Sequence, residues 1–285
     1  MADKLNAPVV VGLGEVVFDI LPDCRKLGGA PADFLHHAVM GGVSGYLVSA
    51  IGADDLGREV ISELQKFEIN PVLAITPYPT GRVLIINTPS GGRSAHILEN
   101  AAWDYIPLTT AAEECIKKAD AIYFGTLALR KAYSKTTMLE LIDMAPSTAY
   151  RFFDVNFRQN YYDAGLVLSL LERADILKLN TDELKVIKTL LKLSGNVEEV
   201  CLALKEKYGL KYLILSDGTK ETRIWGKDGL TSVKNSRLHQ AFAFGAGNAF
   251  GGTFMAALLQ NATQEEAHLK ANAAAAAVCK ASRNK

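Results

Sequence analysis

A glycine-rich stretch near the carboxyl end, Gly245-Ala246-Gly247-Asn248, has the residue types and spacing that suit a bound anion. The glycines open an apolar run, 249–259, that is typical of a helix. Backbone N–H groups at a helix start lack intrahelical partners, and together with the helix dipole they favour a negative charge such as a phosphate. Glycine also permits a positive φ and a close approach of ligand to backbone. A tight turn entering a packed helix would use the same residues, and this stretch alone favours that interpretation because short glycine motifs are common.

Glycine and acidic residues near the amino end form a second group that could bind a polar ligand. Gly28 and Gly29 precede a predicted helix, 32–40, and leave backbone donors exposed in the same way. Asp33 lies in the first turn of that helix. Asp19 stands among apolar residues at the end of an extended run, where a carboxylate could hold the hydroxyl groups of a polyol. An ordinary loop position would explain Asp19 equally well.

Polar residues follow three predicted strands in the second half of the chain. The strands cover 151–156, 176–179 and 212–216, and the polar residues at their ends are Asp154, Asn156 and Arg158, then Asn180 and Glu183, then Ser216 and Gly218. Ligands of parallel α/β sheets bind outside the carboxyl ends of the strands, so we expect these residues to share one edge. Asn180 with Glu183 could instead cap the helix that follows, and Arg158 could be a surface charge.

The elements that must position these residues alternate regularly between strand and helix from residue 121 onward. This alternation predicts an α/β fold with a mostly parallel sheet covered by helices on both faces. The region 82–99 differs, because strands at 82–87 and 94–99 are joined by a turn with no helix between them. We therefore expect a separate small sheet there.

Charge and cysteine content narrow the range of partners. The 31 basic and 31 acidic residues cancel, which argues against nucleic acid or an anionic membrane surface as partner. The four cysteines form no CxxC pair, which argues against a zinc site and favours reduced thiols in a cytoplasmic protein. No apolar run is long enough to span a bilayer, and the polar residues 1–8 predict no signal peptide. At 285 residues the chain can form one large α/β domain or two small ones.

Together these motifs resemble the PfkB, or ribokinase-like, family of carbohydrate kinases, and within it the fructokinase-like members. The matching stretches are Gly28-Gly29-Ala30-Pro31, Asp154-x-Asn156-x-Arg158, Asn180-x-x-Glu183, Ser216-x-Gly218 and Gly245-Ala246-Gly247, in the family's order over nearly the whole chain. The resemblance implies a three-layer αβα sandwich with a mostly parallel sheet, with residues 1–285 forming one domain. It also implies a small β lid, formed by about 21–29 and 78–106, that closes over the sugar. Since such lids often form dimer contacts, it implies a homodimer through the lid.

The chemistry that the resemblance implies is transfer of the γ-phosphate of ATP, with Mg²⁺, to a sugar hydroxyl. The residues it places around the sugar are Asp19, Gly28, Gly29 and Asp33. Those it places at the reacting phosphate are Gly245, Ala246, Gly247, Asn248 and Arg158. By the same resemblance Ser216 and Gly218 touch the nucleotide, while Asn180 and Glu183 hold Mg²⁺ through water.

Several positions depart from the family pattern. Asn248 stands where the family has the aspartate that acts as general base, and a neutral amide cannot accept the proton of the sugar hydroxyl. Asp33 stands where the family has an asparagine that contacts the sugar. Phe242 and Ala243 replace polar residues linked to a monovalent-cation site, which argues against such a cation here. Glu221 replaces a glycine of the nucleotide loop and predicts weak nucleotide binding, because like charges repel.

Two functions from different classes follow from these observations. The first is a sugar kinase with impaired turnover, and the second is a non-catalytic descendant that binds a sugar, a nucleotide or a protein partner. The Asn248 substitution favours the second function, whereas the retained glycines, Arg158 and the Asn180–Glu183 pair favour the first.

Overall fold

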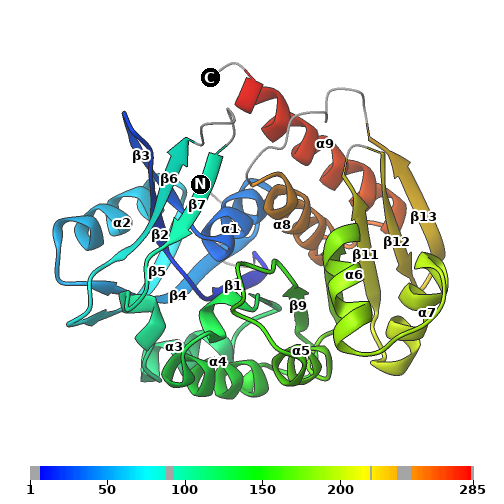
Figure 1. Cartoon of the computed structure of the whole chain (residues 1–285), viewed down its shortest axis with the longest axis horizontal. Helices are drawn as coiled ribbons and strands as arrows, with labels where there is room; N and C mark the ends of the chain where they lie inside the picture. The colour runs from blue at the N-terminus through cyan, green and yellow to red at the C-terminus, as the bar shows by residue number, and fades with distance from the viewer. Residues whose placement is uncertain (1–6, 88–92, 219, 236–244, 284–285) are drawn as a thin grey trace.

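A computed structural model describes residues 7–87, 93–218, 220–235 and 245–283 (Figure 1). The described residues do not include Phe242, Ala243 and Phe244. The prediction that no monovalent cation binds at Phe242 and Ala243 therefore falls outside them. Within the described part of the chain, no helix combines the length and the apolar character needed to cross a membrane.

The main sheet has nine strands in the order β13-β12-β11-β10-β9-β8-β1-β4-β5. Their bounds are β1 Val9–Leu13, β4 Ser44–Gly52, β5 Ile69–Thr76, β8 Ala121–Phe124, β9 Tyr150–Asp154, β10 Ile176–Asn180, β11 Tyr212–Asp217, β12 Glu221–Gly226 and β13 Gly229–Lys234. The strands from β5 to β11 pair in parallel, as the βα alternation predicts, whereas β11, β12 and β13 pair antiparallel at one edge. Sequence analysis did not identify β5.

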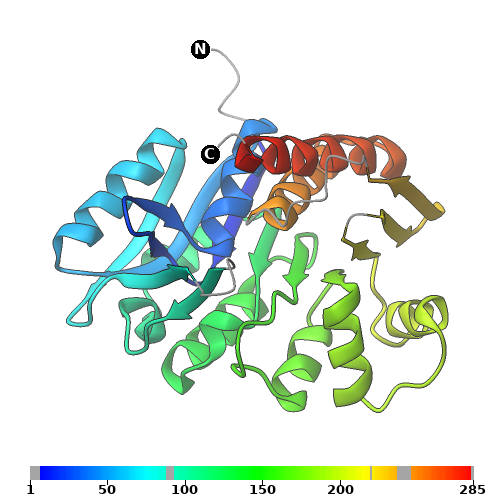
Figure 2. The ribbon, with the colours of Figure 1, turned by 45° about the horizontal axis from the view of Figure 1, so that its top comes forward.

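Helices cover both faces of this sheet and make three layers (Figures 1 and 2). One face carries α3 Thr110–Ile116, α4 Ala132–Met144, α5 Ala164–Leu171, α6 Thr181–Leu190 and α7 Val197–Lys207, and the other carries α1 Ala30–Met40, α2 Asp55–Lys66, α8 Ala246–Leu259 and α9 Gln264–Arg283. Neighbouring strand residues such as Phe152 and Phe153 belong to opposite cores, because successive side chains of a strand alternate between the two faces. This alternation explains why the central strands β1 and β8 are predominantly apolar on both faces.

A second, four-stranded sheet in the order β3-β2-β6-β7 lies beside the main one (Figure 2). Its strands are β2 Val17–Ile20, β3 Arg25–Gly28, β6 Gly81–Asn87 and β7 Arg93–Ile97. The separate small sheet expected around 82–99 is therefore confirmed. The predicted lid ranges need correction, since β2 belongs to this sheet and pairs with β6 from Val17↔Gly81 onward. The end of the 78–106 range is not part of the sheet either, because 102–105 forms a 3₁₀ helix, η2, buried in the core.

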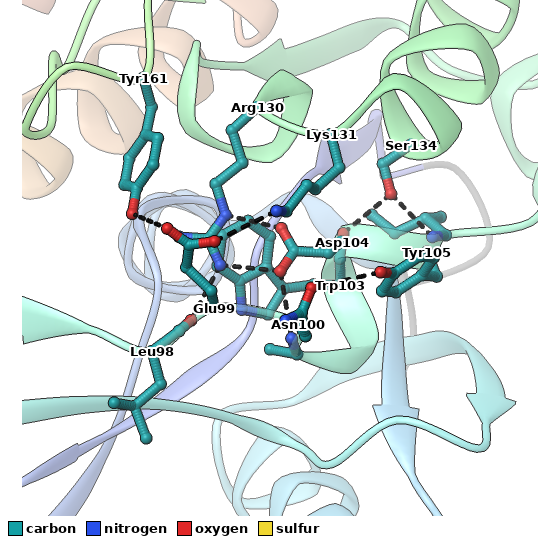
Figure 3. A network of polar contacts seen from close by, with 12 residues as sticks. Leu98, Glu99, Asn100, Trp103, Asp104, Tyr105, Arg130, Lys131, Ser134 and Tyr161 are labelled. Atoms are coloured by element: carbon teal, nitrogen blue, oxygen red, sulfur yellow. Dashed lines mark hydrogen bonds and ion pairs between the residues drawn. The ribbon is translucent and has the colours of Figure 1, made fainter.

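A buried ion pair fastens the returning end of the small sheet to the main body (Figure 3). The guanidinium of Arg130 donates to both carboxylate oxygens of Asp104, at 2.6 and 2.8 Å, and to the carbonyl of Leu98 just after β7, at 2.8 Å. It also lies 4.0 Å from the ring centroid of Trp103. Both charged side chains are almost fully buried, at 1% and 0% exposure. The position of the small sheet therefore depends on a charge pair that has no access to water.

We expect Arg130→Met to destabilise the protein by about 3–5 kcal/mol, because it leaves the Asp104 carboxylate buried and unpaired. The matched control is Arg173→Met, which breaks the exposed pair with Asp143 and should cost about 1 kcal/mol or less. Equilibrium unfolding in urea measures both values. Equal losses of unfolding free energy in the two variants would contradict the idea that burial makes the Arg130–Asp104 pair more costly to break.

Candidate active site

The start of α8 carries the anion-binding features expected from its sequence. Gly245 is the N-cap with φ 88°, a left-handed conformation that favours glycine, and as a glycine it has no side chain with which to cap the helix. The first backbone bond of the helix runs from the Ala249 N–H to the Gly245 carbonyl, at 2.8 Å. The N–H groups of Ala246, Gly247 and Asn248 thus have no partner within the helix. A phosphate has the charge and the acceptors to complete this end.

Close packing of α8 on α1 brings Asn248 to Asp33. A side chain on Gly252 would overlap the carbonyl oxygen of Phe34, so glycine at this position lets the two backbones touch. One turn earlier in α8, the Asn248 Nδ2 donates to the Asp33 Oδ2 at 3.2 Å. A Cβ built on Gly245 would lie 3.7 Å from the same oxygen. The Asp33 carboxylate therefore stands at the start of α8, where we predict that an anion binds.

Asp33 is a buried carboxylate with little compensation. Burial raises the pKa of Asp33 from its ordinary 3.8 to about 7; the hydrogen bond from Asn248 opposes this rise, and the charges of Asp19 and Glu15 add to it. Burial likewise raises the pKa of Asp19, which lies on β2 beside Gly28. The predicted sugar-binding residues Asp19, Gly28 and Asp33 are thus brought to one place.

Glu15 is a site residue that sequence reasoning missed. Its Oε1 accepts a hydrogen bond from the Ala30 N–H, at 3.1 Å, and so completes the start of α1 where Gly29 offers no side chain. Gly29 has φ 108°, and a Cβ there would lie 2.5 Å from the Glu15 carbonyl oxygen, so both its conformation and its surroundings require glycine. An acid set in the otherwise apolar run 9–18 was the available signal.

Lys178 is the second residue that sequence reasoning missed. It lies inside β10, directly opposite Asp154 of β9, and its Nζ contacts the two carboxylate oxygens at 3.0 and 2.8 Å. Both side chains are buried, and the hydroxyl of Tyr123 also donates to Asp154, at 3.3 Å. A Cβ built on Gly247 would lie 3.2 Å from the Lys178 Nζ. The chain therefore holds a buried ammonium group beside the start of α8.

Asn180 and Glu183 form the helix cap that was the alternative interpretation. The Asn180 Oδ1 accepts from the Asp182 and Glu183 N–H groups, both at 2.9 Å, and the Glu183 Oε2 accepts from the Asn180 N–H at 2.8 Å. The Glu183 Oε1 accepts from the Phe157 N–H at 3.2 Å. Each carboxylate oxygen keeps a second lone pair for water, so the cap is compatible with an indirect contact to Mg²⁺. The described residues contain no group of three or more acidic, histidine or cysteine side chains placed to bind a metal directly.

The remaining predicted residues border the same edge. Arg158 is exposed, and burial raises the pKa of Asp19, Glu15 and Glu183 while the Arg158 charge opposes the rise in each. The positive charge of Arg158 therefore lies near enough to act on all three acids.

The nucleotide-binding candidates lie at the end of β11. Ser216 pairs in register with Asn180, and Gly218, with φ 47°, has open space where a Cβ would stand. The negative charge of Glu221, which we expected to repel the nucleotide, has a positively charged neighbour in the structure. Its carboxylate lies 3.3 Å from the Arg223 Nε and accepts from the Ser232 hydroxyl at 2.8 Å.

Comparison with known proteins identifies a matching family and proteins of similar sequence and fold. A family model described as pfkB family carbohydrate kinase matches residues 25–283. Probable fructokinase-5 of Arabidopsis thaliana is 25% identical over 297 aligned residues, which cover 96% of this chain and 90% of that protein. The fold is similar to a fructokinase from Vibrio cholerae O395 solved with fructose, ADP and calcium, with a TM-score of 0.79, 19% identity and coverage of 95% and 92% of the two chains. It is also similar to a putative ribokinase II from E. coli solved with ATP and Mg²⁺, with a TM-score of 0.80, 20% identity and coverage of 95% and 93%.

We expect Asp33 to make the folding stability fall as the pH rises. Its pKa in the folded protein, about 7, lies above its ordinary 3.8, so its contribution is fully present below about pH 4 and is lost as the pH rises through 7. Each unit of pKa difference corresponds to about 1.4 kcal/mol. Asp33→Asn should therefore gain stability relative to the wild type between pH 4 and pH 8, as measured by urea unfolding.

The control for this measurement is Asp228→Asn, which changes an exposed aspartate in the turn between β12 and β13. Its stability should follow the wild type at every pH. A constant difference between Asp33→Asn and the wild type across this range would contradict the assignment of a raised pKa to Asp33.

Proposed function

The chain belongs to the pfkB family of carbohydrate kinases, and from that premise we propose that it transfers the γ-phosphate of ATP to a hydroxyl group of a fructose-like sugar. The observation that carries this proposal is the uncapped start of α8 beside the buried Lys178 ammonium and the Asp33 carboxylate. Phosphoryl transfer needs positioned phosphates, neutralised charge and an oriented acceptor. In this proposal the start of α8 positions the phosphate, Lys178 neutralises charge and Asp33 orients the acceptor.

The phosphate side of the reaction uses the N–H groups of 246–248 and the positive charges of Lys178 and Arg158. In the proposed complex the N–H groups hold oxygens of the transferred phosphoryl group, with Lys178 close to Gly247 and Arg158 facing from the β9 side. Fixed donors of this kind stabilise developing charge without the reorganisation that water requires. Arg158 offers the planar donors that suit phosphate oxygens.

The nucleotide and its metal ion are proposed to lie at the ends of β10 and β11. Ser216 and Gly218 would contact the nucleotide, and the open space at Gly218 is compatible with a close approach. Asn180 and Glu183 would contact Mg²⁺ through water molecules. When bound, Mg²⁺ bridges phosphate oxygens and neutralises their charge. The solved ribokinase II complex with ATP and Mg²⁺ supports this pair of cofactors by analogy of fold.

The sugar is proposed to lie between Asp19, Asp33 and the Gly28-Gly29 turn, with the small sheet acting as a lid. Carboxylates accept hydrogen bonds from sugar hydroxyl groups. Asp33 contacts Asn248 at the start of α8, and Asp19 lies beside Gly28. On this proposal residues 1–285 act as a single domain whose lid moves on its attachment at Arg130. The related fructokinase from Vibrio cholerae O395, solved with fructose, supports the choice of sugar class.

Direct assay decides between this function and a non-catalytic binding protein, which the amide of Asn248 favours. Purified protein is incubated with ATP–Mg²⁺ and a panel of ketohexoses, aldohexoses and pentoses, and ADP formation is followed together with the mass of the sugar product. Phosphorylation of fructose or a close analogue is the expected result. A rise in melting temperature with sugar or nucleotide but without ADP formation would instead establish the non-catalytic function.

We expect Gly247→Ala to lower turnover about 10²-fold without unfolding the protein, because the added methyl group intrudes on the exposed first turn of α8 beside Lys178. The matched control is Gly165→Ala in α5. Gly165 is also the second residue of its helix, and its Cβ would also lie 3.2 Å from a polar side-chain atom. Steady-state kinetics compares the two, and equal activity would argue against phosphate binding at α8.

The homodimer through the lid, which the family resemblance implies, remains a prediction, and among the lid's described residues few apolar side chains are exposed to support it. Val83 and Ile97 are buried in the chain's own core, at 9% and 5% exposure, whereas Ile86 of β6 is 53% exposed. We expect light scattering to report twice the mass of one chain, and Ile86→Lys to shift the protein toward monomer. A monomeric wild type at high concentration would contradict this prediction.

A further inference from the structure

We propose that Asp33 is the general base that takes the proton from the attacking sugar hydroxyl, and that Asn248 holds this carboxylate and the hydroxyl in place. The inference rests on the proposed kinase function. On this inference the amide of Asn248 does not mark a lost base. The carboxylate that the reaction needs belongs to Asp33, which accepts the hydrogen bond of Asn248. Catalytic capacity would then be relocated from α8 to α1 and not lost.

The placement of Asp33 meets the geometric requirement for a base. Its Oδ2 lies 3.2 Å from the Asn248 Nδ2 and 3.7 Å from the position of a Cβ on Gly245, so the carboxylate borders the N–H groups proposed to hold the phosphoryl group. On this proposal, the hydroxyl that attacks a phosphorus atom held there lies within reach of this carboxylate. General bases act over about 2.6–3.2 Å between heavy atoms, the same reach that the amide already spans.

The neighbouring carboxylates are less suited to this role, because each is either bound to another group or has no recorded bond to α8. Asp154 uses both oxygens on the Lys178 ammonium. Each oxygen of Glu183 accepts a backbone N–H, and Glu15 accepts the N–H of Ala30. Asp19 lies on β2, and the structure gives it no contact with α8. In the described part of the chain, Asp33 is the carboxylate that contacts α8, and Asn248 is the hydrogen-bond partner recorded for its side chain.

The step balances with the groups named. The sugar O–H bond breaks and its proton passes to an oxygen of Asp33, while a new O–P bond forms to the γ-phosphorus. The bond from that phosphorus to the bridging oxygen of ADP breaks, and ADP leaves with the electron pair. Asp33 then returns its proton to water after product release. Asn248 remains neutral and donates to the carboxylate throughout.

The electrostatic surroundings support a base that works near neutral pH. Burial raises the pKa of Asp33 to about 7, with Asn248 of α8 opposing and Asp19 of β2 and Glu15 ahead of β2 adding to the rise. Lys178 of β10 lies on the other side of Gly247. A base is most effective when its pKa is close to the working pH, since it is then partly ionised yet still basic. The rate should therefore rise as Asp33 loses its proton, around pH 7.

The proposal reverses the expected effect of placing an acid at position 248. If Asn248 marks a lost base, Asn248→Asp should raise kcat. If Asp33 is the base, Asn248→Asp puts two carboxylates within hydrogen-bond distance of each other, and such pairs share one proton. The Asp33 carboxylate would then be neutralised or held by its new neighbour, and kcat should fall. The two hypotheses thus give opposite signs for one substitution.

The experiment compares four proteins: the wild type, Asp33→Asn, Asn248→Asp, and the double exchange Asp33→Asn/Asn248→Asp. For the best sugar of the panel, kcat and KM are measured with ATP–Mg²⁺ from pH 5.5 to 9, and sugar affinity is measured by calorimetry. We expect Asp33→Asn to lose kcat by roughly 10²–10⁴-fold with sugar affinity nearly kept, and to lose the rise around pH 7. The double exchange should recover much of the loss, because it returns a carboxylate to the other end of the same hydrogen bond.

A comparison substitution separates chemistry from sugar binding. Asp19→Asn alters a carboxylate that is proposed to bind the sugar but does not contact α8, so it should raise KM more than it lowers kcat. Asp33→Asn should show the opposite pattern. Equal effects of both substitutions on KM alone would reduce Asp33 to a binding residue and overturn the inference.

The outcomes separate the two proposals. Asp33→Asn with the kcat of the wild type, or Asn248→Asp with a raised kcat, overturns the assignment of Asp33 and leaves the kinase function intact. A wild type that phosphorylates no sugar of the panel overturns the proposed function itself. If Asp33→Asn fails to fold, the sign of the Asn248→Asp effect and the pH profile of the wild type still decide.

Discussion

Burial of carboxylates at one edge of a parallel sheet is the physical constraint on which this structure depends. An ionised carboxylate in an apolar interior is costly unless a charge or several hydrogen bonds compensate it. Asp154 is compensated by the Lys178 ammonium, Glu183 by two backbone N–H groups, and Glu15 by the first N–H of α1. Among the described residues, the partner recorded for the Asp33 side chain is the amide of Asn248. A buried acid whose recorded partner is a neutral amide therefore stands beside the start of α8, which is where a reactive group is useful.

Close backbone packing decides where that acid stands. Gly252 lets α8 approach the carbonyl of Phe34, and Gly29 lets the chain turn against Glu15 before α1 begins. The two helix starts thereby converge, one with an exposed set of N–H groups and the other with Asp33 in its first turn. A larger residue at either glycine would separate the helices and remove Asp33 from the phosphate side. Stability and chemistry consequently depend on the same contacts.

The sequence predicted the fold well, because the features that define it are local. The βα alternation, the apolar central strands and the hairpin around 82–99 each depend on patterns within a few residues. The bounds of the lid were less accurate, since β2 joins the small sheet by pairing with β6, which is more than sixty residues away in the chain. Lys178 was missed for a similar reason, because its partner Asp154 belongs to the neighbouring strand and the sequence around Lys178 does not indicate that pairing.

What the sequence by itself determined is the inventory of the site: the glycines of α8, the acids near the amino end, Arg158, and the exchange of acid and amide at positions 33 and 248. Read one position at a time, that exchange looks like two separate losses. The tertiary structure alone decided that the two residues, 215 positions apart, share one hydrogen bond. The physical reason is that the charge available at a site depends on which residues the fold brings together. Either residue of this hydrogen-bonded pair can provide a carboxylate at nearly the same position.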